Sequence, residues 1–85
     1  MYFYVYMILT KINGRLISYV GYTKNLKKRL LLHNTSKGAK FTKGKKWKII
    51  YSKKFNTKSK AMREEYLLKK NFKKRNSKKL KFIKK

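Results

Sequence analysis

Residues 2–22 read YFYVYMILTKINGRLISYVGY, and this stretch predicts two strands joined by a tight turn. The first part, residues 2–9, is a run of apolar and aromatic side chains typical of a central strand that is buried on both faces. Asn13 and Gly14 follow it, and both tolerate the positive φ angles that a two-residue hairpin turn requires. Residues 16–22 then return as the second strand. We therefore expect the fold to begin with a β-hairpin.

The rest of the chain predicts two helices and a third strand. Residues 26–33 form the first helix, because residues 23–25 carry the side chains that cap a helix N-terminus. Residues 47–51 (WKIIY) indicate a short strand, and residues 58–72 a second helix. The order β-β-α-β-α predicts a small mixed α/β domain of the α+β type. It would hold a three-stranded antiparallel sheet flanked by helices.

A chain of 85 residues has room for one domain. We assign residues 1–72 to it and residues 73–85 to a basic C-terminal tail, whose scattered apolar residues allow a short helix. Residues 1–9 are apolar but far shorter than the roughly 20 residues of a membrane helix, and they lack the features of a secretory signal. With no cysteine in the chain, we expect a cytoplasmic, nucleoid-associated protein with no membrane partner.

The charge is the most unusual property of the composition. The chain has 27 lysines and arginines against two acidic residues, which gives a formal net charge of +25. So strong a positive field implies a polyanionic partner, and nucleic acid is the first candidate. The alternative is a solvated basic surface that an AT-rich coding sequence has enriched in lysine. Neither interpretation bears on catalysis.

The acidic residues restrict the chemistry. The chain has no aspartate, and its carboxylates are the neighbours Glu64 and Glu65. A two-metal nuclease needs several carboxylates around its ions. A glycosidase needs two that face one bond, but adjacent residues on a helix point about 100° apart. If the protein is an enzyme, it uses one carboxylate and one hard cation such as Mg²⁺, completed by phosphate and water.

Helical spacing distinguishes the two glutamates. Glu65 falls inside the apolar stripe formed by Ala61, Leu68 and Phe72, whereas Glu64 falls nearer the edge of that stripe. A carboxylate directed inward is costly unless it is paired or bound to a metal. Glu65 is therefore the candidate metal ligand. The alternative is an ion pair with the lysine four residues later on the helix.

Five short motifs follow one another along the chain. They are residues 4–6 (YVY), 19–21 (YVG), 26–34 (LKKRLLLHN), 37–42 (KGAKFT) and 61–65 (AMREE). In this order and spacing they resemble the GIY-YIG endonuclease superfamily. The resemblance is greatest to its small single-domain bacterial branch, which is related to the excision-repair nuclease subunit. It covers most of the chain and makes residues 1–72 a nuclease-like domain.

The resemblance implies a role for each site residue. Tyr6 and Tyr19 would position and activate the attacking water, with Tyr6 as the direct base or a relay. His33 would assist proton removal, and Arg29 would bind the scissile phosphate and stabilise its transition-state charge. Glu65 would hold one Mg²⁺ or Mn²⁺ ion, which polarises the phosphate and stabilises the leaving 3′ oxygen.

Other positions would shape the site and contact DNA. Gly21 would permit a close backbone approach. The expected nucleic-acid contacts are Lys24, Lys28, Lys40, Phe41, Thr42, Lys43, Lys45 and Lys69. Phe41 or Trp47 could stack on an unpaired base, although Trp47 opens a strand and also suits the core. Contacts to phosphates position a protein on DNA but do not read its sequence. Binding should therefore be salt-sensitive and largely independent of sequence.

The chain departs from the family pattern at three positions. Tyr4 stands where the GIY element has glycine, Tyr22 where a basic residue is frequent, and Glu64 where the residue before the metal ligand is usually basic. We expect a metal-dependent DNA endonuclease acting in repair, recombination or related DNA processing. The alternative is a non-catalytic nucleic-acid-binding module on the same fold. Branched, nicked and single-stranded DNA are all open as substrates, as is the oligomeric state.

Overall fold

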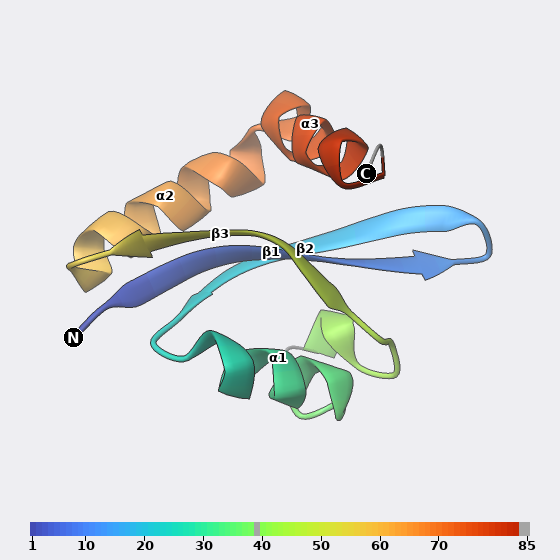
Figure 1. The fold of residues 1–85 in the computed structure, drawn as a ribbon, viewed down its shortest axis with the longest axis horizontal. Coiled ribbons are helices and arrows are strands. Elements are labelled where there is room, and N and C mark those ends of the chain that lie inside the picture. The colour runs from blue at the N-terminus through green and yellow to red at the C-terminus, as the bar shows by residue number, and fades with distance from the viewer. Residues whose placement is uncertain (39, 84–85) are drawn as a thin grey trace.

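A computed structural model describes residues 1–38 and 40–83 of the protein and shows a three-stranded antiparallel sheet between two layers of helices (Figure 1). The elements in chain order are β1 (Phe3–Ile12), β2 (Arg15–Thr23), α1 (Leu26–Asn34), the short 3₁₀ helix η1 (Lys40–Thr42), β3 (Lys48–Phe55), α2 (Lys58–Lys70) and α3 (Phe72–Ile83). The predicted fold class is therefore confirmed, with one further helix at the end. Ala39, in the KGAKFT motif, and residues 84–85, in the predicted tail, lie outside the described residues.

The hairpin forms as its turn residues predict. Asn13 and Gly14 have φ angles of 51° and 79°, the left-handed conformation that both central residues of a type I′ turn adopt. Strands β1 and β2 pair without a shift from the turn outward, and this register places Tyr6 opposite Gly21. Residues that lie far apart in the sequence are thereby brought to one point on the sheet.

Strand β1 lies in the centre of the sheet, which has the order β2-β1-β3. Strand β3 is longer than the predicted residues 47–51, because it continues through exposed polar residues to Phe55, which pairs with Phe3. An edge strand tolerates such side chains, since its backbone still pairs along one side. Trp47 lies just before the strand and is buried.

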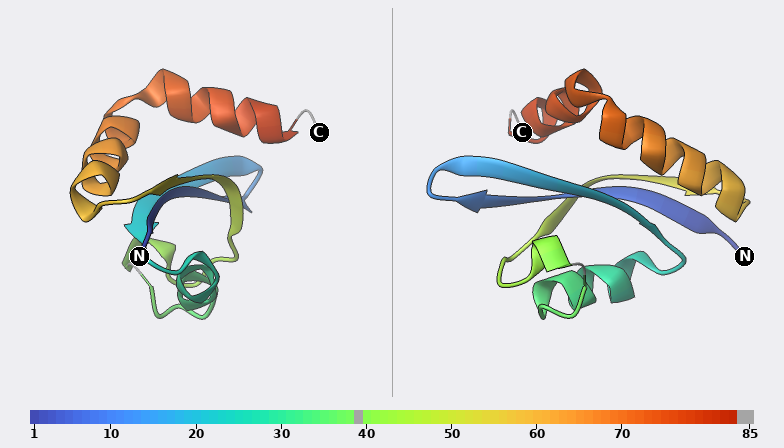
Figure 2. Two further views of the ribbon diagram at one scale, coloured as in Figure 1. Left: turned by 60° about the vertical axis from the view of Figure 1, so that its left-hand side comes forward. Right: turned by 180° about the vertical axis from the view of Figure 1, so that it is seen from behind.

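The two faces of the sheet carry separate apolar clusters, because side chains alternate along β1. One cluster contains Val5, Met7, Val20, Ala61 and Leu68, and it joins the sheet to α2. The other contains Tyr6, Ile8 and Trp47, with Leu26 and Leu30 of α1 packed against them. Figure 2 shows α1 on one side of the sheet and α2 and α3 on the other.

The predicted second helix, residues 58–72, ends two residues earlier in the structure. Helix α2 ends at Lys70, and Asn71 lies between it and α3. The Asn71 Oδ1 accepts a hydrogen bond from the Lys74 backbone N–H at 3.0 Å. An asparagine in this position caps the helix that follows. The prediction that Leu68 faces the core is confirmed. The same prediction for Phe72 is wrong, because the chain changes direction before it and leaves it 66% exposed.

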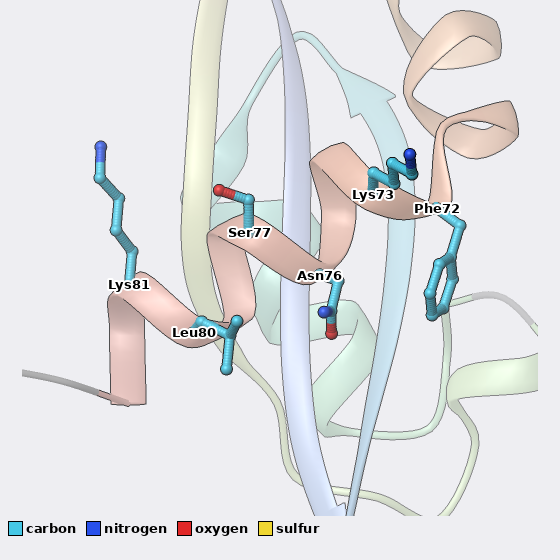
Figure 3. A pocket seen from close by; sticks show the side chains of 6 residues that line it. All are labelled: Phe72, Lys73, Asn76, Ser77, Leu80 and Lys81. Atoms are coloured by element: carbon cyan, nitrogen blue, oxygen red, sulfur yellow. The ribbon is translucent and has the colours of Figure 1, made fainter.

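Residues assigned to the tail form α3, which lies on the same side of the sheet as α2 (Figures 1 and 2). A salt bridge and a cation–π contact help to hold it there. The Lys74 ammonium lies 3.7 Å from a Glu64 carboxylate oxygen, and the Lys78 ammonium lies 3.6 Å from the centre of the Tyr51 ring. The side chains of α3 also form an open hollow of about 380 Å³ (Figure 3), lined by Phe72, Lys73, Asn76, Ser77, Leu80 and Lys81. Within the described residues, no helix has the length and apolar character needed to cross a membrane.

Candidate active site

The site is built around the Tyr6 side chain, which rises from β1 on the side of the sheet that α1 covers. Tyr6 is 2% exposed, and its hydroxyl lies directly beside Gly21 of β2. A Cβ atom on Gly21 would lie 2.5 Å from the Tyr6 hydroxyl oxygen and 3.2 Å from a carbon of the Tyr19 ring. Glycine therefore leaves the space that the phenol fills.

His33 extends the site through two short hydrogen bonds. Helix α1 begins at the cap Asn25, whose Oδ1 accepts from the Lys28 backbone N–H, and it carries His33 in its last turn. The His33 ring is completely buried. Its Nε2 lies 2.7 Å from the Tyr6 hydroxyl, and its Nδ1 lies 2.8 Å from the Thr42 Oγ1. Both ring nitrogens are thus engaged, and no edge of the ring is exposed to solvent.

Thr42 occupies a different place from the one predicted for it. It was expected among the nucleic-acid contacts, but its side chain is completely buried and hydrogen-bonded to His33. The prediction is wrong because the loop turns inward through η1 at this residue. Trp47 also lies in the core, where its Nε1–H donates to the Thr42 carbonyl at 3.1 Å, so it offers no ring for a base to stack on.

Two residues that support His33 were quoted within motifs but not assigned a role. A Cβ on Gly38 would lie 2.6 Å from His33 Nδ1 and 3.1 Å from its Cα, so only glycine fits against the ring. The Asn34 side chain accepts from the Trp47 backbone N–H at 2.6 Å and donates to its carbonyl at 3.2 Å. These contacts fix the end of α1 to the loop that carries Thr42. The KGAKFT motif was the available signal for this packing.

Arg29 lies between the buried cluster and the surface. Its Nε–H donates to the Tyr6 hydroxyl at 3.4 Å, and this bond raises the pKa of Arg29. Arg29 also lines a polar hollow of about 360 Å³ at the start of α1, together with Thr23, Lys24, Asn25, Lys28 and Leu32. Three cations at a helix N-terminus form an environment suited to a phosphate group.

Tyr19 begins a series of rings that leads from His33 to the surface. The Tyr19 ring meets the edge of the His33 ring with 5.2 Å between centroids, and it stacks on Phe41 at 6.2 Å with planes 20° apart. Phe41 is 52% exposed. Lys45 stabilises the position of Phe41. The Lys45 ammonium donates to the Phe41 carbonyl at 3.0 Å and lies over the Phe41 ring.

The protonation states of the buried groups follow from their surroundings. Burial raises the pKa of Tyr6, and the charges of Tyr19 and Glu65 raise it further, against the hydrogen bond and charge of Arg29, which lower it. Burial lowers the pKa of His33, and the Arg29 charge adds to the effect. At neutral pH Tyr6 is therefore a phenol and His33 a neutral imidazole.

Glu65 lies apart from this cluster, on α2. Its side chain is 20% exposed, and its carboxylate lies 3.8 Å from the Lys69 ammonium. Within residues 1–38 and 40–83, no hydrogen bond or ion pair joins it to Tyr6, Tyr19, Arg29 or His33, although its charge contributes to the raised pKa of Tyr6. The site therefore consists of four residues in contact and one carboxylate whose charge acts on Tyr6.

The neighbouring Glu64 has a different environment. It pairs with Lys74 of α3, and its charge adds to the burial that raises the pKa of Tyr51. Its contacts are with the layer formed by α2 and α3, whereas Glu65 acts on Tyr6. The two adjacent carboxylates thus point to separate parts of the molecule, as helical spacing predicts.

The donor set limits which metal could bind. Among the described residues, no group of three His, Cys, Asp or Glu side chains comes together. A site for two ions, or a closed site made only of protein ligands, is therefore not present in that part of the chain. A single partly exposed carboxylate suits one hard cation that keeps water and takes its other oxygens from a phosphate. Glu65 fits this arrangement.

The remaining predicted nucleic-acid contacts lie in three places. Lys24 and Lys28 flank the hollow beside Arg29, whereas Lys40, Phe41, Lys43 and Lys45 lie on the loop beside Tyr19. Lys69 lies on α2 and is engaged with Glu65. The first two groups belong to the side of the sheet that carries Tyr6.

The chain is similar to several known proteins. The sequence profile of the GIY-YIG catalytic domain matches residues 2–80. A UPF0213 protein of Staphylococcus haemolyticus is 43% identical over 67 residues, which are 78% of each chain. One of Oceanobacillus iheyensis is 54% identical over 52 residues, which are 60% of each chain, so the match spans about three fifths of that relative.

A solved structure is also similar. The solution NMR structure of a UPF0213 protein from Bacillus halodurans aligns with a TM-score of 0.50 and 32% sequence identity. The alignment covers 96% of this chain and 85% of that one.

Proposed function

This chain belongs to the GIY-YIG catalytic domain family, and we propose that it is an endonuclease that hydrolyses phosphodiester bonds in DNA. It uses one Mg²⁺ or Mn²⁺ ion and reads little sequence. The observation that carries the proposal is the buried chain of hydrogen bonds from Arg29 through Tyr6 to His33, which opens beside a cationic hollow. Its pathway would be repair, recombination or related DNA processing.

Tyr6 and His33 activate the attacking water. His33 is neutral, and its Nε2 lies at hydrogen-bond distance from the Tyr6 hydroxyl. The Tyr6 oxygen takes a proton from water while the Tyr6 proton moves to His33 Nε2, so the phenol acts as a relay. A direct phenolate base would require a lowered Tyr6 pKa, and the pKa of Tyr6 is raised.

Arg29 holds the scissile phosphate close to this relay. It touches Tyr6 with its Nε–H, and the hollow that it lines also holds Lys24 and Lys28. A phosphate in this hollow would contact Arg29, whose Nε–H reaches the Tyr6 oxygen, and would be neutralised by several cations. The guanidinium stabilises the charge that grows on the phosphoryl oxygens as the bond breaks.

Glu65 holds the cation. When bound there, Mg²⁺ or Mn²⁺ would supply charge neutralisation for the phosphate and the leaving 3′ oxygen. Glu65 must exchange its ion pair with Lys69 for this bond, and the pair is weak because it is long and the Lys69 side chain is half exposed. The freed Lys69 ammonium would then be available to a DNA phosphate.

The loop between α1 and β3, which carries Lys40, Phe41 and Lys43, would bind DNA. Lys40 and Lys43 are exposed, and Phe41 presents half of its surface beside Tyr19. Lysines neutralise phosphates without reading bases, and an exposed aromatic ring can stack on a base that lacks a partner. These features support, as the substrate, DNA that has unpaired bases near the cleaved bond. Branched, nicked and single-stranded DNA all have such bases.

A second candidate function is a non-catalytic nucleic-acid-binding module. Two observations favour it: the Glu65 carboxylate is paired with Lys69, and Tyr6 is 2% exposed. In this case the net charge of +25 provides the affinity, and the buried cluster serves only the fold.

Nicking of supercoiled plasmid in Mg²⁺ tests the proposal. We expect wild-type protein to nick, Glu65→Gln to bind DNA without nicking, and Tyr6→Phe to nick at least about 10²-fold more slowly, the usual contribution of a general base. Glu64→Gln is the matched control and should nick like wild type, because Glu64 pairs with α3.

Two outcomes would contradict the proposal. Binding by every variant without nicking by any of them would favour the non-catalytic module. Equal nicking by wild type and Glu65→Gln would show that Glu65 is not the metal ligand. Parallel assays on branched, nicked, single-stranded and duplex oligonucleotides identify the DNA form.

A further inference from the structure

We propose that Thr42 is a positioning residue that fixes the tautomer of His33. Its Oγ1 accepts the hydrogen of His33 Nδ1 and so keeps the Nε2 lone pair directed at Tyr6. The catalytic consequence rests on the proposed function, whereas the tautomer is a property of the folded chain by itself. Thr42 then determines whether His33 can accept a proton from Tyr6.

The first step concerns the hydrogen atoms around the Tyr6 oxygen. Arg29 is permanently protonated and can only donate, so its Nε–H occupies one acceptor position of this oxygen. Tyr6 has one hydrogen of its own to place, and the hydroxyl is enclosed by Gly21 and His33. Among the residues that the structure describes, His33 Nε2, at 2.7 Å, is the hydrogen-bond partner to which the Tyr6 hydroxyl can donate. Nε2 therefore carries no hydrogen.

The second step follows for the other ring nitrogen. A neutral imidazole without hydrogen on Nε2 must carry it on Nδ1. Burial and the Arg29 charge lower the pKa of His33, which keeps the ring neutral. Thr42 Oγ1 lies 2.8 Å from Nδ1 and is the oxygen that receives this hydrogen. The two bonds together orient the ring as in sites where a second group holds the base.

The third step concerns why Thr42 can hold this position. Its side chain is completely buried, its carbonyl accepts from the Trp47 indole, and Gly38 closes on the same edge of the His33 ring. Neither the ring nor the hydroxyl has room to move away. In Thr42→Val, a methyl group would replace the hydroxyl, and a hydrogen on His33 Nδ1 would be buried without an acceptor. The ring would then favour the other tautomer, in which Nε2–H donates to Tyr6 and the Tyr6 hydrogen turns to a water at that oxygen.

Nitrogen NMR of the His33 ring tests the assignment directly. The chain contains one histidine, so the two ring-nitrogen signals need no sequence assignment. In wild type at neutral pH we expect a protonated Nδ1 and an unprotonated Nε2. Thr42→Val, which keeps the shape, should move the hydrogen to Nε2, and Thr42→Ser, which keeps the hydroxyl, should retain the wild-type pattern.

Cleavage rates provide the second readout. Thr42→Val should nick plasmid about 10²-fold more slowly than wild type, comparable with the loss of general-base catalysis, and Thr42→Ser should stay within about threefold. A backbone amide spectrum verifies that each variant is folded. Hydrogen on Nε2 in wild type, or on Nδ1 in folded Thr42→Val, would overturn the inference even if the chain never cuts DNA. The wild-type tautomer pattern in a chain that does not nick would instead count against the proposed function alone.

Discussion

The contact between Gly21 and Tyr6 leads to a quantitative prediction for Gly21→Ala. The added methyl would lie 2.5 Å from the Tyr6 hydroxyl oxygen and 2.8 Å from its Cζ, well inside van der Waals contact. Tyr6 cannot swing away, because it is buried and its hydroxyl is bonded to His33. Overpacking of this kind costs about 1–3 kcal/mol. In a domain of this size each 1 kcal/mol lowers Tm by about 4–8 °C.

Thermal and urea unfolding measured by circular dichroism test this value. Gly21 does not have a positive φ angle, so the loss of stability should arise from steric overlap and not from backbone strain. In a double-mutant cycle, Tyr6→Phe should recover at least about 0.5 kcal/mol of the loss, since it removes the atom nearest to the new methyl. A Gly21→Ala chain as stable as wild type, or additive losses in the cycle, would refute the close approach.

Three further predictions concern the rest of the site. The pKa of His33 is lowered from 6.5 on folding, so the unfolded chain binds a proton on this residue more readily than the folded chain does. The free energy of unfolding of the wild type should therefore fall as pH decreases below about 6.5. His33→Gln should remove this pH dependence. Unfolding curves between pH 5 and 8 measure this, and a flat wild-type profile would contradict it. Asn34→Ala should lower the free energy of unfolding by about 1–3 kcal/mol, because it leaves the buried backbone N–H and carbonyl of Trp47 without the Asn34 side chain. An unchanged urea midpoint would show that these two hydrogen bonds are not needed for stability. Lys40→Gln combined with Lys43→Gln should reduce the slope of log affinity for DNA against log salt by about 1.4–1.8, as measured by fluorescence anisotropy; an unchanged slope would place the DNA elsewhere.

The elements that the sequence predicted best are those with strong local signals. Asn13-Gly14 defined the hairpin, Asn25 the start of α1, and the apolar run of residues 2–9 the central strand. The end of the second helix is predicted two residues too late, at residue 72, because helical periodicity continues past Lys70. The asparagine caps α3 by a contact that spacing alone does not distinguish from an interior position.

The candidate site divides in the same way. Order and spacing of the motifs identified Tyr6, Arg29 and His33, which the structure brings into contact. Thr42 was assigned to the surface, since a threonine in a basic loop carries no sign that the loop turns inward. Gly38 was not assigned at all, because its role depends on a tertiary contact with a residue on α1.

The burial of Tyr6, His33 and Thr42 has a consequence for how this protein can evolve. These side chains fill the core beneath α1, so selection for folding alone would retain them in a descendant that lacks the proposed cleavage activity. Glu65 is partly exposed, and its ion pair with Lys69 is replaceable. Loss of this carboxylate would leave the fold intact. In a lineage of such chains, the identity of residue 65 would therefore be the sensitive record of whether selection still acts on cleavage.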